Sequence, residues 1–149
     1  GKVLVSAQWV YDRLGESRVR VFDCSWTSDE SRNVKQEYEA AHIPNASFLD
    51  FTELRDRSSP LPNMLPPLDQ FTQAVQRAGI LKDDVVVLYD SEGVYTSARV
   101  WYTFKYFGFE NVFVLNGGLP KYVSSGFEYH DEAEHGAVAA PSPSDLQPQ

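Results

Sequence analysis

The chain contains one cysteine, and it is short of positive charge. A single cysteine forms no internal disulfide, which favours a reducing compartment. Because 13 Lys and Arg stand against 21 Asp and Glu, for a formal net charge of −8 at pH 7, we expect neither a nucleic acid nor an anionic membrane as a partner. No apolar run approaches the roughly 18 residues of a membrane span, and no signal-peptide pattern begins the chain. We expect no membrane association and a cytoplasmic or mitochondrial location.

The 149 residues are 42% hydrophobic and 13% aromatic, enough for the core of one domain. Short apolar runs predict strands, and amphipathic segments of about ten residues predict helices. The strands are expected at 19–24, 46–50, 85–89 and 111–115, and the helices at 7–14, 34–42, 68–78, 97–107 and 120–125. This alternation predicts an α/β fold, a doubly wound and mostly parallel sheet with helices on both faces.

The last part of the chain differs in composition from the rest. After residue 130 it becomes acidic and then rich in Ala, Pro and Ser, a composition typical of linkers. We expect one domain over 1–130 and, over 131–149, a linker toward a second domain.

A polar loop follows the most apolar run, VVVLY, at 85–89. Ligands of open parallel sheets bind outside the carboxyl ends of the strands, and the start of a helix there offers unpaired N–H groups to an anion. The loop nevertheless carries two acids, no Cys, His or Lys, and no cation nearer than Arg99. Two interpretations are open: a turn that caps the next helix and helps to dock a neighbouring domain, or a ligand or regulatory site. The loop residues are Asp90, Ser91, Glu92, Gly93, Val94 and Tyr95.

Other chemically active side chains give weaker signals. Cys24 is followed by Ser25 and the bulky Trp26 instead of a glycine-rich loop, so we interpret it as a small buried residue. His130 and His135 share no ligand spacing with any pair of carboxylates. We therefore expect no metal and no cofactor.

Six stretches, in order, resemble the N-terminal half of the tandem-domain sulfurtransferases, the rhodanese and 3-mercaptopyruvate sulfurtransferase enzymes. They are VSAQW (5–9), FDCSW (22–26), EYEAAHIPNA (37–46), DRSSPLP (56–62), ARVW (98–101) and LNGGL (115–119). The resemblance implies a rhodanese-like domain and a second, C-terminal rhodanese domain in the same protein. Only the second domain of that family carries the catalytic Cys.

The resemblance also implies what an active loop would contain. An active rhodanese domain has a Cys directly after the central strand, where backbone N–H groups stabilise its thiolate. The thiolate takes a sulfur atom from a donor, becomes a persulfide and passes the sulfur on. Here Asp90 occupies that position. Because a carboxylate cannot hold a sulfane sulfur, and Asp90 with Glu92 would repel thiosulfate, we expect a sulfurtransferase whose catalysis belongs to the partner domain, and no activity in these residues alone.

Four residues are candidates for contact with a substrate or with the second domain. Tyr95 and Arg99 flank the loop, although an Arg there could equally tie the helix to a carboxylate. Asp56 and Arg57 precede prolines, and we expect them to form a local ion pair in a rigid loop that faces the partner domain. None of the four is expected to be catalytic.

Some mercaptopyruvate-type relatives place an Asp and a His from this half near the catalytic Cys. The matching positions here are Thr52 and Asn63, which cannot relay a proton, so the sulfur donor, thiosulfate or 3-mercaptopyruvate, stays open. An alternative is a stand-alone, catalytically inactive rhodanese-like module that binds or regulates a partner. Without a partner domain the chain could also self-associate through exposed apolar surface.

Overall fold

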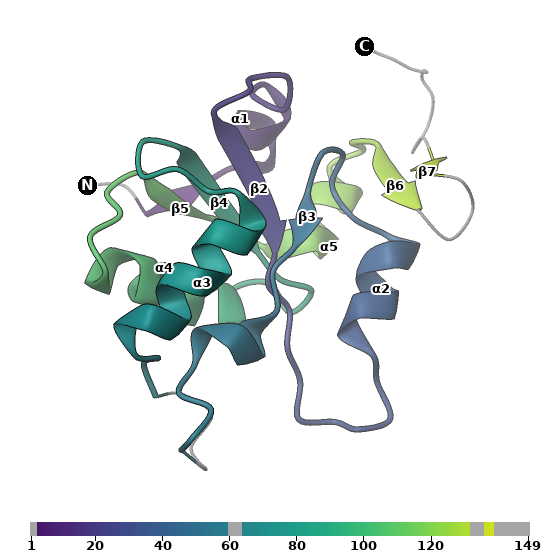
Figure 1. The fold of residues 1–149 in the computed structure, drawn as a ribbon. Coiled ribbons are helices and arrows are strands. Elements are labelled where there is room, and N and C mark those ends of the chain that lie inside the picture. The colour runs from purple at the N-terminus through teal and green to yellow at the C-terminus, as the bar shows by residue number, and fades with distance from the viewer. Residues whose placement is uncertain (1–2, 60–63, 132–135, 139–149) are drawn as a thin grey trace.

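The computed structural model describes residues 3–59, 64–131 and 136–138. Its centre is a five-stranded sheet in the order β1-β5-β4-β2-β3, in which every neighbouring pair is parallel. The apolar strand β4 lies in the middle of the sheet (Figure 1). The strands are β1 (Leu4–Val5), β2 (Val19–Asp23), β3 (Ser47–Phe48), β4 (Val85–Tyr89) and β5 (Val112–Leu115). The predicted parallel α/β architecture is confirmed.

Helices cover both faces of this sheet. They are α1 (Ala7–Tyr11), α2 (Val34–Ala40), the 3-10 helix η1 (Phe51–Leu54), α3 (Leu68–Ala78), α4 (Thr96–Tyr106) and α5 (Gly118–Ser124). The hydroxyl of Ser6 accepts the Trp9 N–H at 3.0 Å and caps α1, as expected for a Ser before an apolar helix. Gly79, in the left-handed conformation with φ 69°, ends α3.

The alternation of side chains along β4 divides the core into two halves. Val86 and Leu88 pack with α3 and α4, whereas Val87 and Tyr89 pack with α1 and α5. All four are fully buried, because a central parallel strand has no solvent-facing side. Figure 1 shows α3 and α4 together on one side of the sheet. This packing fixes the carboxyl end of β4, where Asp90 begins the loop.

Some boundaries differ from the predicted ones. The two residues of β1 are too few for a periodic signal, yet they extend the sheet by pairing with β5. Helix α5 begins at Gly118, ahead of Pro120, because a proline in the first helical turn lacks only an N–H that has no intrahelical partner. The 3-10 helix η1 was not predicted, and α1 ends at Tyr11 instead of at residue 14.

The C-terminal part of the described chain forms a hairpin of β6 (Tyr129–Asp131) and β7 (Gly136–Val138). Two backbone hydrogen bonds between His42 and His130, of 3.0 and 2.8 Å, attach β6 to the segment after α2. The predicted linker begins within this hairpin, and residues 132–135 and 139–149 lie outside the described residues. The division into domain and linker therefore stays a prediction. No helix in the described part of the chain is long and apolar enough to cross a membrane.

Candidate functional site: the Asp90 loop and the adjoining pocket

The carboxylate of Asp90 fills the anion cradle at the start of α4. Asp90 follows β4 directly and is completely buried. Its Oδ1 accepts the backbone N–H of Glu92, and its Oδ2 accepts those of Tyr95 and Ser97, all at 2.8 Å. Unpaired N–H groups at a helix start attract an anion. The loop thus keeps the donors that would suit a thiolate or an oxyanion, and the protein's own side chain uses them. These hydrogen bonds show the predicted capping of the helix, and the predicted docking of a neighbouring domain stays a prediction.

A glycine-rich turn presses against the same loop. The N–H of Leu119 donates to the backbone oxygen of Asp90 at 3.1 Å. A Cβ on Gly118 would lie 2.2 Å from that oxygen and 2.9 Å from the oxygen of Gly93, and Gly118 has a φ of 60°. Only glycine fits this contact. The close approach explains Gly118, whereas Gly117 has a φ of 81° and a Cβ there would lie 2.5 Å from Lys121 Cβ.

Two contacts join the loop to the segments that follow β2. The N–H of Ser91 donates to the hydroxyl of Ser25 at 2.9 Å. Arg32 pairs with both carboxylate oxygens of Glu37 at 2.8 and 3.0 Å, and it also reaches Glu92 at 3.1 Å. A bidentate guanidinium contact fixes geometry as well as charge. The second acid of the loop is therefore held by Arg32.

A second buried carboxyl, Asp23, lies at the end of the strand beside β4. Burial raises the pKa of Asp23, the hydrogen bonds from Ser25 oppose this shift, and the charge of Asp90 adds to it. The Ser25 N–H donates to Asp23 Oδ1 at 2.9 Å. Two acids therefore converge at the carboxyl edge of the sheet. Their charge disfavours a further anion there.

Cys24 is enclosed by the core, as predicted. Its side chain is completely buried and its thiol donates to the backbone oxygen of Tyr89 at 3.4 Å. Burial raises the pKa of the Cys24 thiol, and the charges of Asp90 and Asp23 raise it further. Because the thiolate is the nucleophile, this environment keeps the sulfur in its unreactive form.

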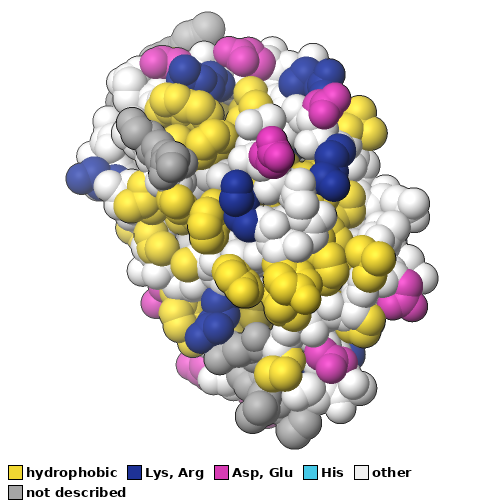
Figure 2. All heavy atoms as spheres, turned by 90° about the vertical axis from the view of Figure 1, so that its left-hand side faces the viewer, with side chains coloured by type: hydrophobic (Ala, Val, Ile, Leu, Met, Phe, Trp, Pro, Cys, Tyr) yellow, Lys and Arg dark blue, Asp and Glu magenta, His cyan; other side chains and the backbone are white. Residues whose placement is uncertain are grey.

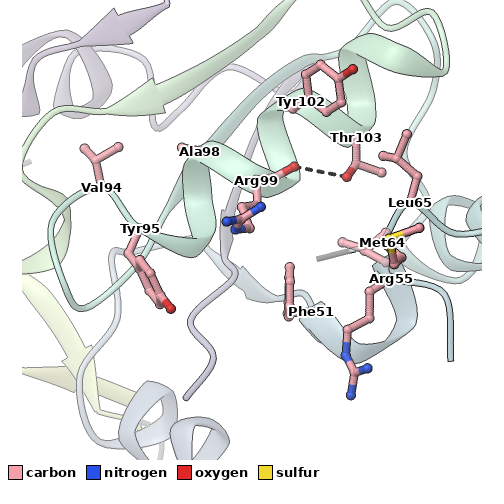
Figure 3. A pocket seen from close by; sticks show the side chains of 11 residues that line it. Phe51, Arg55, Met64, Leu65, Val94, Tyr95, Ala98, Arg99, Tyr102 and Thr103 are labelled. Atoms are coloured by element: carbon pink, nitrogen blue, oxygen red, sulfur yellow. Dashed lines mark hydrogen bonds between the residues drawn. The ribbon is translucent and has the colours of Figure 1, made fainter. Parts of the chain in front are cut away.

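A pocket of about 400 Å³ adjoins the loop. Its walls come from η1, the segment at 64–65, the loop residues Val94 and Tyr95, and one side of α4. Most of its lining is apolar, and two arginines, Arg55 and Arg99, supply its charge. Figure 3 shows Tyr95 and Arg99 extending from the start of α4 toward the side formed by Phe51 and Arg55.

The pocket brings together some of the predicted contact residues and not others. Tyr95 and Arg99 line it, whereas Asp56 and Arg57 do not. The expected ion pair between Asp56 and Arg57 is wrong for the described residues: Asp56 instead accepts the N–H and hydroxyl of Ser58 at 3.0 and 2.7 Å, and these bonds lower the pKa of Asp56. A serine two residues after an Asp forms such a turn without a cation.

The sequence left open that Arg99 ties the helix to a carboxylate. In the structure Arg99 makes no ion pair with any carboxylate in the described ranges. Its guanidinium is left facing the pocket. Sequence reasoning missed the other side of the pocket, which Phe51, Leu54 and Arg55 form, because no periodic pattern marks η1.

Thr52, one of the two positions compared with acid–base residues of relatives, belongs to the start of η1. Its hydroxyl and N–H both donate to Asp50 Oδ1, at 2.7 and 2.9 Å. This arrangement is a local helix cap. Asn63, the second position, lies outside the described residues. Within the described part of the chain, no group of three or more His, Cys, Asp or Glu could hold a metal ion.

The surface around the pocket carries several exposed apolar side chains. Met64, Val94, Tyr95 and Tyr102 line the pocket and are exposed to solvent, and Tyr106 continues the row along α4. Figure 2 looks onto the side of the molecule where α4 lies and shows hydrophobic side chains gathered there, with Lys and Arg between them.

Comparisons with known proteins agree on the family. The model of the rhodanese-like domain matches residues 6–125. The chain is 42% identical over 136 residues to the mitochondrial thiosulfate/3-mercaptopyruvate sulfurtransferase 1 of Arabidopsis thaliana, covering 91% of this chain and 36% of that protein. It is 36% identical over 140 residues to the 3-mercaptopyruvate sulfurtransferase of Escherichia coli (strain K12), covering 92% and 48%.

A solved structure gives the same result. The crystal structure of the 3-mercaptopyruvate sulfotransferase SseA from Escherichia coli superposes with a TM-score of 0.82 at 33% identity, covering 95% of this chain and 53% of that one. The chain thus spans between about a third and a half of the length of these relatives. It belongs to the rhodanese-like domain family, with sulfurtransferases as its relatives.

Proposed function

We propose that this chain is the N-terminal, non-catalytic rhodanese domain of a two-domain sulfurtransferase. The observation that carries the proposal is Asp90, whose carboxylate accepts three backbone N–H groups directly after the central strand, where the resemblance places the cysteine of an active domain. The relatives named thiosulfate or 3-mercaptopyruvate sulfurtransferase are two to three times as long as the part they share with this chain. That difference leaves room for a second domain.

The chemistry of sulfur transfer supports this assignment. In a persulfide mechanism a thiolate attacks the outer sulfur of thiosulfate, the S–S bond breaks, and sulfite leaves with the electron pair. The acceptor then attacks the outer sulfur of the persulfide, and the thiolate is regenerated. Asp90 has no thiol, its oxygens are occupied, and the only described cysteine, Cys24, is a buried thiol. Both steps would therefore take place on a second domain.

In this proposal the described domain has two tasks. Its apolar face, with Val94, Tyr95 and Tyr102, would pack on the catalytic domain and exclude water, and the loop would form one wall of the cleft between the domains. The domain would add no acid–base group from Thr52, because that hydroxyl donates to Asp50. The donor, thiosulfate or 3-mercaptopyruvate, would be selected by the second domain.

The proposal is tested by assaying residues 1–149 with thiosulfate and cyanide, and separately with 3-mercaptopyruvate and a thiol. We expect no turnover above the rate of a buffer blank, since no reactive thiolate is present. The Cys24→Ser variant is the matched control, because it removes the only sulfur nucleophile. Sustained turnover that Cys24→Ser abolishes would contradict the proposal.

A stand-alone binding module is the second candidate. The pocket favours it, since Arg55 and Arg99 line a cavity with mostly apolar walls and pair with no described carboxylate. The natural coding sequence separates the two candidates. A second α/β unit with a cysteine directly after its central strand supports the tandem enzyme, and a stop near residue 149 supports the module.

A further inference from the structure

Independently of the sulfurtransferase assignment, we propose that Asn116 is a site of spontaneous chemical modification, at which its side-chain amide closes onto the peptide nitrogen of Gly117 and is converted into aspartate and isoaspartate. The site lies in the turn between β5 and α5, directly against the Asp90 loop. The proposal depends on the sequence of this turn, on the hydrogen bonds that hold other asparagines and not Asn116, and on the contacts of the turn with the loop.

The reaction needs only water as a co-reactant. The Gly117 N–H gives its proton to hydroxide or water, and the peptide nitrogen forms a bond to Cγ of Asn116. The Cγ–N bond of the side-chain amide then breaks and ammonia leaves, which closes a cyclic imide. Water adds to either carbonyl carbon of the imide and opens the ring. One opening gives an aspartate, and the other gives an isoaspartate, in which the side-chain carbon has become part of the backbone.

The residue after Asn116 favours this attack. The chain has five asparagines, and Asn116 alone is followed by glycine. Asn33 and Asn111 are each followed by valine, whose β-branched side chain is stiff and crowds the neighbouring peptide group. Gly117 has no side chain and lies in the left-handed region with a φ of 81°, so its nitrogen is not shielded by a Cβ.

Hydrogen bonding separates Asn116 from other exposed asparagines. The Oδ1 of Asn33 accepts the Gln36 N–H at 3.0 Å as the cap of α2. The Nδ2 of Asn45 donates to the Leu14 backbone oxygen at 2.9 Å. The side chain of Asn116 is exposed and makes no hydrogen bond with any residue that the structure describes. Its amide is therefore free to turn toward the backbone.

The attacking nitrogen is free as well. Within the described ranges, the N–H of Gly117 donates to no acceptor. The corresponding nitrogen after Asn45 differs, because the N–H of Ala46 donates to the Ile43 oxygen at 2.9 Å. A peptide N–H that is hydrogen-bonded has to give up its partner before its nitrogen can attack, and Gly117 has no such bond to lose.

A change in this turn reaches the Asp90 loop. The N–H of Asn116 donates to the Val5 oxygen at 2.8 Å, and the N–H of Leu119 donates to the Asp90 oxygen at 3.1 Å. Between these two hydrogen bonds, Gly118 lies so close to the loop that a Cβ would not fit. Isoaspartate lengthens the backbone by one carbon within this interval, so the hydrogen bond from Leu119 loses its geometry. We therefore expect isoaspartate, and not aspartate, to loosen the loop.

The test is an incubation of the chain in mildly alkaline water enriched in ¹⁸O, followed by tryptic peptide mapping. Hydrolysis of the imide places an ¹⁸O atom on the converted residue, whereas conversion during digestion in ordinary water does not. Asn111 and Asn116 lie in one tryptic peptide, 106–121, and its fragments distinguish them. We expect Asn116 to acquire the label at least about tenfold faster than Asn33, Asn45 or Asn111.

Two variants separate the reaction from its consequence. Asn116→Gln keeps an exposed amide but would have to close a larger ring, so position 116 should acquire the label no faster than Asn111. Asn116→Asp carries the new charge on a backbone of ordinary length. The isolated isoaspartate form should exchange the Leu119 amide hydrogen at least about threefold faster than the unmodified chain. Asn116→Asp should keep the exchange rate of the unmodified chain.

Three results would overturn the proposal. Labelling of Asn116 no faster than that of Asn111 would mean that the turn keeps the Gly117 nitrogen away from the side chain. Equal labelling of Asn116→Gln would mean that the amide reacts without the imide. An isoaspartate form with unchanged exchange at Leu119 would mean that the turn does not hold the loop. None of these measurements involves sulfur transfer, so the proposed function stands or falls by its own assay.

Discussion

Replacing Asp90 by alanine removes the acceptor for three backbone N–H groups that define the loop. The N–H of Ser97 is buried, and we expect it to lose its partner outright, at about 1–3 kcal/mol. The N–H groups of Glu92 and Tyr95 are partly exposed, so water can replace the carboxylate there at a smaller loss. The interaction of the charge with the start of α4 contributes about 0.5–2 kcal/mol more.

The substitution also removes the cost of burying one charged group, which offsets part of these losses. We therefore expect Asp90→Ala to lower the free energy of unfolding by about 2–4 kcal/mol. For a chain of this length the midpoint of thermal unfolding should fall by roughly 4–16 °C. Urea unfolding followed by circular dichroism measures the change in free energy, and calorimetry measures the midpoint.

Two further variants make this prediction decisive. Asp90→Asn keeps one acceptor oxygen, which can serve Tyr95 and Ser97 together, so it should lose about half as much as Asp90→Ala. Asp83→Asn, at a side chain that is 89% exposed, should change the free energy of unfolding by no more than about 0.5 kcal/mol. A loss below about 0.5 kcal/mol in both Asp90 variants would refute the view that this carboxylate holds the loop together.

Three other predictions follow from the same site. Asp90→Cys in a Cys24→Ser background should react with iodoacetamide at pH 7 faster than Cys24 does in the unmodified chain, because the vacated N–H donors would stabilise its thiolate; equal rates would show that the cradle has lost its effect. Gly118→Ala should cost at least about 2 kcal/mol in urea unfolding, because its Cβ would lie 2.2 Å from the Asp90 oxygen, and a neutral effect would contradict the close approach. The pKa of Asp23 is raised by burial, so its stabilising contribution is complete below its unfolded pKa and is lost as pH rises through the folded pKa. Asp23→Asn should therefore gain stability relative to the unmodified chain as pH is raised from 4 toward 7, and unfolding curves with a pH-independent difference would contradict the shift.

Much of the fold could be predicted because its signals are local. The apolar run of β4 and the periodic face of α3, whose bounds match the predicted ones, are each visible within about ten residues. The position of Asp90 after β4 follows from the same run. By contrast, β1 has two residues and exists through its pairing with β5, which no local pattern can reveal.

The chemistry of the site was only partly predictable. The two acids of the loop are visible in the sequence. The hydrogen bonds from the Glu92, Tyr95 and Ser97 N–H groups to both Asp90 oxygens depend on the backbone conformation of the loop. The far wall of the pocket comes from η1, which lies more than 40 residues away from α4 in the chain. Long-range juxtaposition of this kind has no periodic signature.

The ion pair expected between Asp56 and Arg57 was wrong for a local reason. We expected Arg57 as the partner of Asp56 because it is the adjacent cation in the sequence. In the turn, the Asp56 carboxylate instead accepts hydrogen bonds from Ser58, whose N–H and hydroxyl both lie within 3.0 Å of one carboxylate oxygen. An exposed ion pair gains little in water, and a short side chain two residues ahead closes the turn at a smaller loss of side-chain entropy.

The central claim is that the loop at Asp90 keeps the cradle of a sulfurtransferase and lacks its nucleophile. The most direct measurement is thiocyanate formation from thiosulfate and cyanide by residues 1–149, with mass spectrometry of the protein after exposure to thiosulfate alone. We predict no thiocyanate above the blank and no protein species heavier by one sulfur atom. Steady thiocyanate production, together with an added sulfur on Cys24, would contradict the claim.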